Sequence, residues 1–279
     1  MKIGLQRFLL IISFISIAFS VRAQTSLGGN IFDRRNNKPL QNVSVSIKKK
    51  NIGSLSDKKG HFEISAAKLK KTDTLVISSV GYSTIKIPVS DAFLLKDYFL
   101  AEDSKNLEDV VVKAYKNHSS EGSVSEVTGY FRGWNTRKGG GEIGRIINVR
   151  SDDFKVEKVR FKANNQCDTC IVRLHIRDLK NGLPDMDLLR DSLTIEIHKS
   201  SFDDRFAEFD LTDKNIIIKK SRYVFVSLET ISCNSKNNGS CSLAYIGTEE
   251  GNYLYRTRDY RAWEESTSHS LYLKMFYTY

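Results

Sequence analysis

The sequence reads SDKKGHFEI at residues 56–64 and DTLVISSVGY at residues 73–82. In the first stretch, Asp57 can accept bonds from the backbone that follows it, and Gly60 adopts a positive φ without steric cost. We therefore expect a tight turn that opens a hairpin. Apolar residues alternate with polar ones in both stretches, which is the period of half-buried β-strands. Together they predict a small antiparallel β-sandwich.

Similar segments lie on both sides of these two stretches. Short runs of strand-forming residues occur around Ile31 and at residues 43–47, 82–89, 98–100 and 107–112. Turn signals separate these runs, so this part of the chain is expected to hold about seven short strands. That number and spacing are typical of an all-β sandwich.

Linked motifs follow one another along this part of the chain. They are Gly29-x-Ile31-x-Asp33, Lys38-Pro39-Leu40-x-Asn42-Val43-x-Val45, Ser56-Asp57-x-x-Gly60-x-Phe62-x-Ile64, Leu75-x-Ile77-Ser78-x-Val80-Gly81-Tyr82 and Leu107-x-x-Val110-Val111-Val112. Their order resembles that of the carboxypeptidase regulatory-like domain, over about residues 27–115. The resemblance implies a transthyretin-like sandwich of the kind found in exported proteins of Gram-negative bacteria, often ahead of the plug of outer-membrane receptors. It also implies a scaffold or docking module without catalytic residues.

The first residues have the pattern of a signal peptide. Lys2 and Arg7 precede an apolar run at residues 8–19, and Val21-Arg22-Ala23 offers the small residues that a signal peptidase accepts. We expect residues 1–23 to be removed and the protein to be exported, to the periplasm or the cell surface of a Gram-negative bacterium. The apolar run is too short for a membrane span, which needs roughly 20 residues, and no cysteine near the cleavage site could carry a lipid anchor.

The chain is basic, with a formal net charge of +10. In an exported protein, a basic surface favours acidic polysaccharide, lipopolysaccharide or a membrane face over nucleic acid as its partner. We therefore expect no nucleic acid partner and no transmembrane segment. The expected partner is a polysaccharide or an envelope protein.

After residue 115 the composition changes. Residues 116–128 are polar and rich in serine, so we expect a linker between a first domain at residues 24–115 and a second at residues 129–279. Strand patterns recur through the second domain without an amphipathic helix of normal length, which favours a two-sheet jelly roll. The expected fold class is all-β: a seven-stranded transthyretin-like β-sandwich followed by a jelly-roll β-sandwich.

One set of segments in the second domain shows a wider likeness. It comprises Arg173-Leu174-His175-Ile176, Asn181-Gly182-Leu183-Pro184 with Leu188-Leu189, Phe209-Asp210-Leu211 and Tyr223-Val224-Phe225-Val226-Ser227-Leu228-Glu229. The set is similar to lectin-like jelly-roll modules of bacterial surface proteins. This likeness implies architecture more than activity.

All four cysteines lie in the second domain, at Cys167, Cys170, Cys233 and Cys241. Disulfides are the default in an exported protein, and four thiols allow three pairings. We favour local bridges, Cys167 with Cys170 and Cys233 with Cys241, because each pair flanks a loop between strands. Cross-pairing and a four-thiolate zinc site are the alternatives.

The segment from Tyr253 to Trp263 is the most suggestive binding stretch. Its rings could stack on sugar faces, and its arginines could pair with uronate or sulfate groups. The competing interpretation is that the rings fill the core of the sandwich. The predicted ligand-binding residues are Tyr253, Tyr255, Arg256, Arg258 and Trp263.

Catalytic signals are weak. Glu208 and Asp210 would share one face of a strand, as paired carboxylates do in glycoside cleavage, but the chain has only 2 Trp residues to stack sugars. A solvated strand edge is the better interpretation. The 5 histidines, His175 among them, are scattered, with no pair at metal-ligand spacing on one element, so we assign them no role. We expect no metal, no cofactor and no enzymatic activity.

The sequence thus leads to three functional hypotheses. The first is an exported, non-catalytic binding protein of the cell envelope whose ligand is a carbohydrate. The second is a structural or protein-docking module associated with an outer-membrane receptor system. The third is a glycoside-cleaving enzyme built on Glu208 and Asp210.

Overall fold

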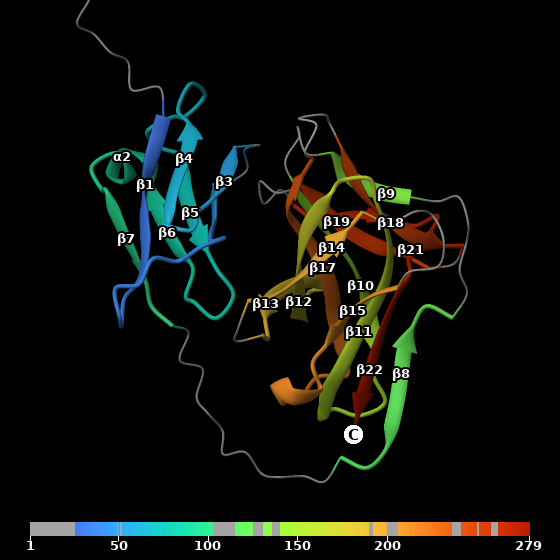
Figure 1. Cartoon of the computed structure of the whole chain (residues 1–279). Coiled ribbons are helices and arrows are strands. Elements are labelled where there is room, and N and C mark those ends of the chain that lie inside the picture. Colours follow the sequence, from blue (N-terminus) through green and yellow to red (C-terminus); the bar gives the residue numbers. More distant parts are fainter. Residues whose placement is uncertain are drawn as a thin grey trace, which may run out of the picture.

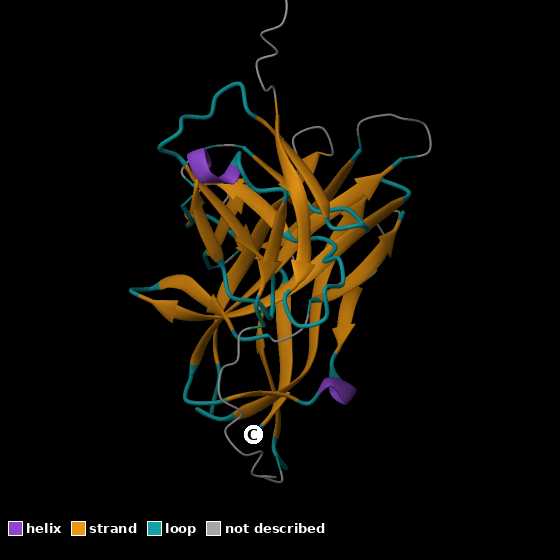
Figure 2. Ribbon diagram, turned by 90° about the vertical axis from the view of Figure 1, so that its left-hand side faces the viewer, coloured by secondary structure: helices purple, strands orange, loops and turns teal. Residues whose placement is uncertain are grey.

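The computed structural model is almost entirely β-structure, with two short helices among the described residues (Figure 2). It describes residues 26–48, 50, 52–102, 115–124, 131–135, 140–189, 192–199, 206–235, 241–249, 251–257 and 262–279. The predicted signal peptide and the predicted strand at residues 107–112 lie outside these ranges. No described helix is long and apolar enough to cross a membrane.

Residues 26–102 form the N-terminal domain, a sandwich of two sheets shown from blue to green in Figure 1. One sheet has the strand order β4-β1-β7 and the other β3-β2-β5-β6, which confirms the predicted β-sandwich. Its seven described strands include β3, which was not predicted, whereas the predicted strand at residues 107–112 lies outside the described residues. The elements are β1 (Ser26–Asp33), β2 (Ser44–Ile47), β3 (Gly53–Leu55), β4 (His61–Ser65), β5 (Thr74–Ser78), β6 (Ile85–Pro88), α2 (Val89–Ala92) and β7 (Asp97–Leu100).

The predicted turn is present, but it does not close a hairpin. The Oδ1 of Asp57 accepts bonds from the amides of Lys59 at 2.8 Å and His61 at 2.9 Å. Gly60 has a φ of +79°, and a Cβ there would lie 2.5 Å from the carbonyl oxygen of Ile31. Strand β3 before the turn pairs with β2, whereas β4 after it pairs with β1. The turn therefore carries the chain from one sheet to the other, because β4 docks against the strand that contains Ile31.

The C-terminal domain, from residue 115 onward, is a second and larger sandwich. Its first sheet, here the β12 sheet, has the order β13-β12-β17-β10-β19-β20, with β14 also paired to β12. The strands of this sheet are β10 (Gly141–Asn148), β12 (Thr169–Lys180), β13 (Leu183–Asp187), β14 (Leu193–His198), β17 (Tyr223–Asn234), β19 (Tyr253–Thr257) and β20 (Glu264–Ser266).

The second sheet, here the β11 sheet, has the order β21-β18-β11-β22-β8; strands β15 and β16 also pair with β11, and β9 pairs with β18. Its elements, with the 3-10 helix η2, are β8 (His118–Gly122), β9 (Phe131–Asn135), β11 (Phe154–Asn165), β15 (Phe206–Asp210), η2 (Thr212–Lys214), β16 (Ile216–Ile218), β18 (Ser242–Thr248), β21 (Ser270–Leu271) and β22 (Leu273–Thr278). Strands β10, β11 and β12 alternate between the two sheets, as do β17, β18 and β19, which is the crossing pattern of a jelly roll.

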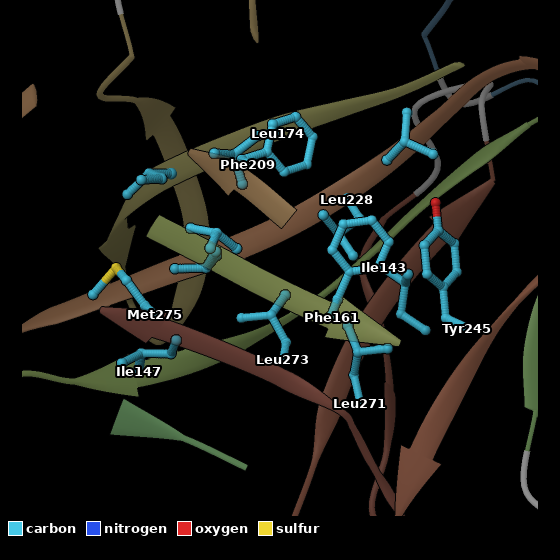
Figure 3. Packing of buried hydrophobic residues seen from close by; sticks show 14 of the residues in the cluster. Ile143, Ile147, Phe161, Leu174, Phe209, Leu228, Tyr245, Leu271, Leu273 and Met275 are labelled. Carbon is cyan, nitrogen blue, oxygen red and sulfur yellow. The ribbon is translucent and has the colours of Figure 1, made fainter. Parts of the chain in front are cut away.

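The core of the C-terminal domain lies between its two sheets. Figure 3 shows Phe161 and Leu273 of the β11 sheet facing Ile143, Leu174 and Leu228 of the β12 sheet. All five side chains are almost completely buried. Because successive side chains of a strand point to opposite faces, this arrangement leaves the other face of the β12 sheet directed away from the core.

Part of the predicted linker is an ordered edge strand. Residues His118–Gly122 form β8, which pairs antiparallel with β22. Its residues are polar, and all but His118 are partly buried. Ion pairs from Glu121 to Arg150 at 3.1 Å and from His118 to Glu157 at 3.4 Å join it to neighbouring residues.

The cysteines form two disulfides, but the favoured local pairing is wrong. The bonds join Cys167 to Cys241 and Cys170 to Cys233. Strand β12 pairs with β17 in a register that sets Cys170 directly opposite Cys233, so the bridge crosses between neighbouring strands. The other bridge joins the start of β12 to the start of β18, and the two cross-links therefore tie together segments more than 60 residues apart.

Candidate functional site

The outer face of the β12 sheet carries charged side chains that are buried. Along β12, Leu174 and Ile176 point into the core, so Arg173, His175 and Arg177 point to the opposite face. These three residues are only 2%, 4% and 7% exposed. Charged residues are almost never buried in this way unless they are paired, so each must have partners on the same face.

The partners come from the neighbouring strands through the sheet register. Glu229 of β17 lies opposite Arg173, and Glu142 of β10 lies opposite both Glu229 and Arg256 of β19. Asp187 of β13 lies opposite Arg177. We call this set the charged face, and it consists of Glu142, Arg173, His175, Arg177, Asp187, Glu229 and Arg256.

Glu142 is the centre of one half of the charged face. Its carboxylate accepts bonds from Arg177, from the hydroxyl of Ser227 at 2.6 Å and from Arg256 at 2.7 and 3.0 Å. Burial opposes its ionisation, but the charges of Arg177 and Arg256 outweigh that effect and hold the pKa of Glu142 well below its usual range. The group is therefore a permanent anion with both oxygens occupied.

His175 is the centre of the other half. Its Nδ1 lies 2.5 Å from a carboxylate oxygen of Asp187, and its Nε2 lies 2.9 Å from Oε2 of Glu229. Burial and the charge of Arg177 disfavour its protonation, but Glu142 and Asp187 outweigh them and raise the pKa of His175. With a carboxylate at each ring nitrogen, the imidazole donates from both and carries a positive charge.

Glu229 is shared between His175 and Arg173. Arg173 Nη1 lies 3.4 Å from Oε2 of Glu229, the same oxygen that receives the His175 bond. Burial opposes ionisation, yet Arg173 and the His175 hydrogen bond lower the pKa of Glu229 to about 2. Glu229 is therefore ionised at any physiological pH.

The charged face forms one wall of a cavity between the two domains. The cavity has a volume of about 810 Å³ and is lined by Arg173, His175, Arg177 and Arg256 from the C-terminal domain. Residues 78–82, which end the stretch that identified the N-terminal sandwich, line it from the other side. Figure 1 shows the two domains next to each other with this face between them.

Direct contacts hold the domains together at this cavity. Arg173 Nη2 donates to the backbone carbonyl of Asn42 at 2.7 Å, which joins the charged face to the N-terminal domain. Val80 is buried and belongs to the same cluster of apolar residues as the core of the C-terminal domain. The cavity is thus built by both domains.

Trp263 supplies an aromatic ring to the cavity wall. The Arg256 guanidinium lies 4.4 Å from the ring centroid, Arg177 lies 5.9 Å from it, and Phe225 packs edge-on at 4.9 Å. Gly144 makes room for this packing, because a Cβ there would lie 2.7 Å from Cζ of Phe225. The ring is partly exposed and is held beside two cations.

The predicted binding residues separate into two groups. Arg256 and Trp263 line the cavity. Tyr253 is buried in the core, and Tyr255 packs on that core with its hydroxyl donating to Glu264 at 2.7 Å. Strand alternation places both tyrosines on the face opposite Arg256, whereas Arg258 lies outside the described residues.

The predicted carboxylate pair, Glu208 and Asp210, does not line this cavity. Glu208 binds Lys158 and Arg160, each at 2.8 Å, and Asp210 accepts from the hydroxyl of Thr212 at 2.7 Å. Burial opposes the ionisation of Glu208, but the hydrogen bonds from the two cations lower its pKa. The hydrogen bonds to Thr212 lower the pKa of Asp210 as well. A general acid needs the opposite shift.

Sequence reasoning missed most of the charged face. Arg173, His175 and Arg177 alternate with apolar residues along one strand, and Ser227 and Glu229 do the same along its neighbour. This alternation is the ordinary pattern of a sheet with one solvated face. The only available signal was the presence of both charge signs among the alternating residues, since Arg173 and Arg177 are basic and Glu229 is acidic. Side chains of opposite sign can pair when another part of the protein covers this face of the sheet.

The comparisons with known proteins concern mainly the N-terminal domain. Residues 27–112 match the family model of the CarboxypepD_reg-like domain. A segment of 122 residues is 28% identical to the TonB-dependent receptor SusC of Bacteroides thetaiotaomicron. The match covers 43% of this chain and 12% of that protein. The chain thus spans about an eighth of the length of this receptor.

Solved structures give weaker likenesses. The cysteine protease and lectin-like domains of Cwp84, a surface layer associated protein of Clostridium difficile, align with a TM-score of 0.33 at 10% identity, over 85% of this chain and 59% of that one. A structure of infectious bursal disease virus aligns with a TM-score of 0.30 at 10% identity, over 91% of this chain and 63% of that one. Neither is close enough to carry an argument.

The motifs, the seven-stranded sandwich and the family match agree on the first part of the chain. Its two sheets contain the predicted strands that lie within the described residues, with β3 in addition, and the turn at Gly60 has the expected positive φ. The matched range begins within β1 and extends past the end of β7. Residues 27–112 of this chain are a carboxypeptidase regulatory-like domain.

Proposed function

We propose that this chain is an exported, envelope-associated binding protein whose carbohydrate ligand occupies the cavity between its two domains. The observation that carries the proposal is the cavity itself, about 810 Å³ in volume and lined by Trp263 and a row of charged side chains. That volume lies within the range of about 300–1,000 Å³ that is typical of sites for small molecules. It suits an oligosaccharide rather than a whole polymer.

The lining has the chemistry that sugars require. Sugar hydroxyls both donate and accept hydrogen bonds. The cavity is lined by Arg177 and Arg256, whose guanidinium groups are donors, and by the exposed Asp185, whose carboxylate is an acceptor. The partly exposed ring of Trp263 offers a flat apolar surface on which the C–H face of a sugar can stack. The ring is pre-positioned by Arg256 and Phe225, so it loses little conformational freedom when a ligand binds.

Four observations support the cell-envelope location. Residues 27–112 match the CarboxypepD_reg-like domain, and a segment of the chain is similar to a TonB-dependent receptor. The apolar and basic residues before Gln24 support export. The two disulfides are typical of proteins in an oxidising compartment such as the periplasm or the cell surface.

A docking role in a receptor system is the second candidate, and one contact favours it. The hydrogen bond from Arg173 to the carbonyl of Asn42 connects the charged face to the N-terminal domain and helps to fix the two domains together. Under this alternative, the cavity results from the packing of the two domains and binds no ligand. A protein partner would then bind another surface of the chain.

Ligand binding by residues 24–279 separates the two candidates. The protein would be titrated with neutral and acidic oligosaccharides in a calorimeter, beside the Trp263→Ala variant and the matched control Phe206→Ala. Phe206 is a partly exposed ring on the β11 sheet and does not line the cavity. We expect Trp263→Ala to weaken binding about tenfold, the value of a stacked ring, and Phe206→Ala to leave it unchanged. Failure of every sugar to bind the folded protein would refute the carbohydrate proposal and leave docking.

A further inference from the structure

We infer that the ligand of this cavity is a linear oligosaccharide of at least three units, which leaves the cavity along the outer face of the β12 sheet and stacks its last unit on Tyr223. The inference rests on the proposed function and gives its ligand a minimum length and a direction. Three features support it: the continuation of the cavity wall, a second aromatic ring on the same sheet face, and the narrow width of the apolar surface around that ring.

The wall of the cavity continues toward Tyr223. Pro184 of β13 lines the cavity and lies directly opposite Leu179 of β12. Strands β12 and β17 are paired as far as Arg177 and Phe225. Extending that register by two residues sets Leu179 beside Tyr223. Neighbouring strands lie about 4.8 Å apart, so Tyr223 is about 10 Å from the cavity wall at Pro184.

Exposed apolar side chains occupy this part of the sheet face. Tyr223 is two residues from Phe225 and therefore shares its face, and Ile146 of β10 lies directly opposite Phe225. Tyr223 is 55% exposed and Ile146 is 39% exposed, whereas Val224, which points into the core, is completely buried. Leu179 is partly exposed. We call Ile146, Leu179 and Tyr223 the apolar shelf.

The shelf supplies a second aromatic ring to the face that carries Trp263. Trp263 packs edge-on against Phe225, with 4.9 Å between the ring centroids. It also lies against Arg256, which the register places farther from Tyr223 than Phe225 is. Two residues of a strand span about 7 Å, so Trp263 and Tyr223 are about 10 Å apart. An extended sugar chain covers that distance in about two units, so a chain that stacks on both rings has at least three.

Tyr223 is held in place, and a polar group borders it. The hydroxyl of Ser221 donates to the carbonyl of Tyr223 at 2.9 Å, and pairing with β10 fixes the strand that follows. Asn148 lies directly opposite Tyr223 and is exposed, so its amide can donate to and accept from sugar hydroxyls. A ring presented by a rigid strand loses little conformational freedom when a ligand binds.

The width of the shelf favours a single sugar chain over a protein partner. Its three side chains come from the neighbouring strands β12, β17 and β10, which together are about 10 Å wide. A stable protein interface buries about 800 Å² on each partner and takes about 20–30 residues from it. Single exposed apolar residues are common on protein surfaces, but these three adjoin a cavity that contains another ring. One extended chain fits that arrangement.

A series of chain lengths tests the shelf. Residues 24–279 would be titrated in a calorimeter with linear xylan, galactan and galacturonan oligomers of two to six units, in a buffer of physiological salt concentration. In each series that binds, we expect the affinity to rise about tenfold between two and four units and then to level off, because only the longer chains reach Tyr223.

Variants distinguish contact with Tyr223 from the statistical advantage of longer chains. Tyr223→Ala should reduce the gain between two and four units to about twofold and leave the affinity for two units unchanged, whereas Tyr223→Phe keeps the ring and should keep the gain. Trp263→Ala should weaken the binding of every length. The matched control is Phe206→Ala, which removes a ring that is 40% exposed on the β11 sheet and should change neither quantity. Thermal melting would verify that each variant is folded.

The possible results separate this inference from the proposed function. Affinity that does not depend on length, or a gain with length that Tyr223→Ala leaves intact, would overturn the inference and leave a carbohydrate-binding cavity at Trp263. Equal weakening of short and long oligomers by Tyr223→Ala would also overturn it, because Tyr223 would then contact the first units. Failure of every oligomer to bind the folded protein would overturn both proposals.

Discussion

The Glu142→Gln substitution should destabilise the protein by about 3 kcal/mol. Removing one partner of a buried ion pair costs about 3–5 kcal/mol, because the remaining charge is left buried and uncompensated. The side chains of Glu142 and Arg177 are 4% and 8% exposed, so water cannot take the place of the lost carboxylate. Glutamine keeps the shape and accepts some of the same hydrogen bonds, which places the expected loss at the lower end of that range.

Urea denaturation at pH 7 with the disulfides intact measures this loss. Circular dichroism follows the strands. Tryptophan fluorescence, to which Trp134 and Trp263 both contribute, includes a signal from the charged face, because Arg256 lies against both the Trp263 ring and Glu142. A loss of about 3 kcal/mol corresponds to a lowering of the midpoint by about 1 M or more, given a dependence of about 1–3 kcal/mol per molar urea.

The matched control is Glu208→Gln. Glu208 also binds two cations, Lys158 and Arg160, but the three side chains are 26–37% exposed on the outer face of the β11 sheet. Exposed ion pairs of this kind contribute about 0–1 kcal/mol. If Glu142→Gln lowered the unfolding free energy no more than Glu208→Gln does, the charged face would not be a desolvated network, and the reasoning about its cations would fail.

Three further predictions concern other features. The raised pKa of His175 means that its stabilising charge is complete below about pH 6.5 and is lost as pH rises through the folded-state pKa, so the stability difference between wild type and His175→Gln should shrink from pH 6 to pH 9 in urea titrations. A constant difference would contradict this. Gly144→Ala should lower the melting temperature, because its Cβ would lie 2.3 Å from the carbonyl oxygen of Val226, and an unchanged value would be unexpected. Mass spectrometry of unreduced peptides should detect a Cys170–Cys233 bridge and no peptide with Cys170 bonded to Cys167.

The N-terminal sandwich could be predicted because its signals are local. The Asp57 turn needs only the side chain of Asp57 and the conformational freedom of Gly60, and both act within five residues. Strand alternation is equally local. The pairing of β4 with β1 was not predictable in this way, because it depends on contacts between segments about 30 residues apart.

The disulfides and the charged face depend on register between distant strands. Cys170 meets Cys233 because β12 and β17 are neighbours in the sheet, and a register shift between Ile171 and Val172 then places Glu229 opposite Arg173. No pattern within either strand contains that information. The register at the cysteines alone would place Thr230 opposite Arg173, so the partner of the arginine depends on this irregularity as well.

The opposite orientations of Arg256 and the two neighbouring tyrosines could have been predicted from the sequence. Tyr253, Tyr255 and Arg256 look like one binding surface when they are read along the chain, but a strand sends Arg256 to the face opposite the two tyrosines. Applying the period of 2 to this segment would have separated the core residues from the cavity residue. The position of Trp263 beside Arg256 could not have been predicted from the sequence, because it depends on the path that the chain takes after β19.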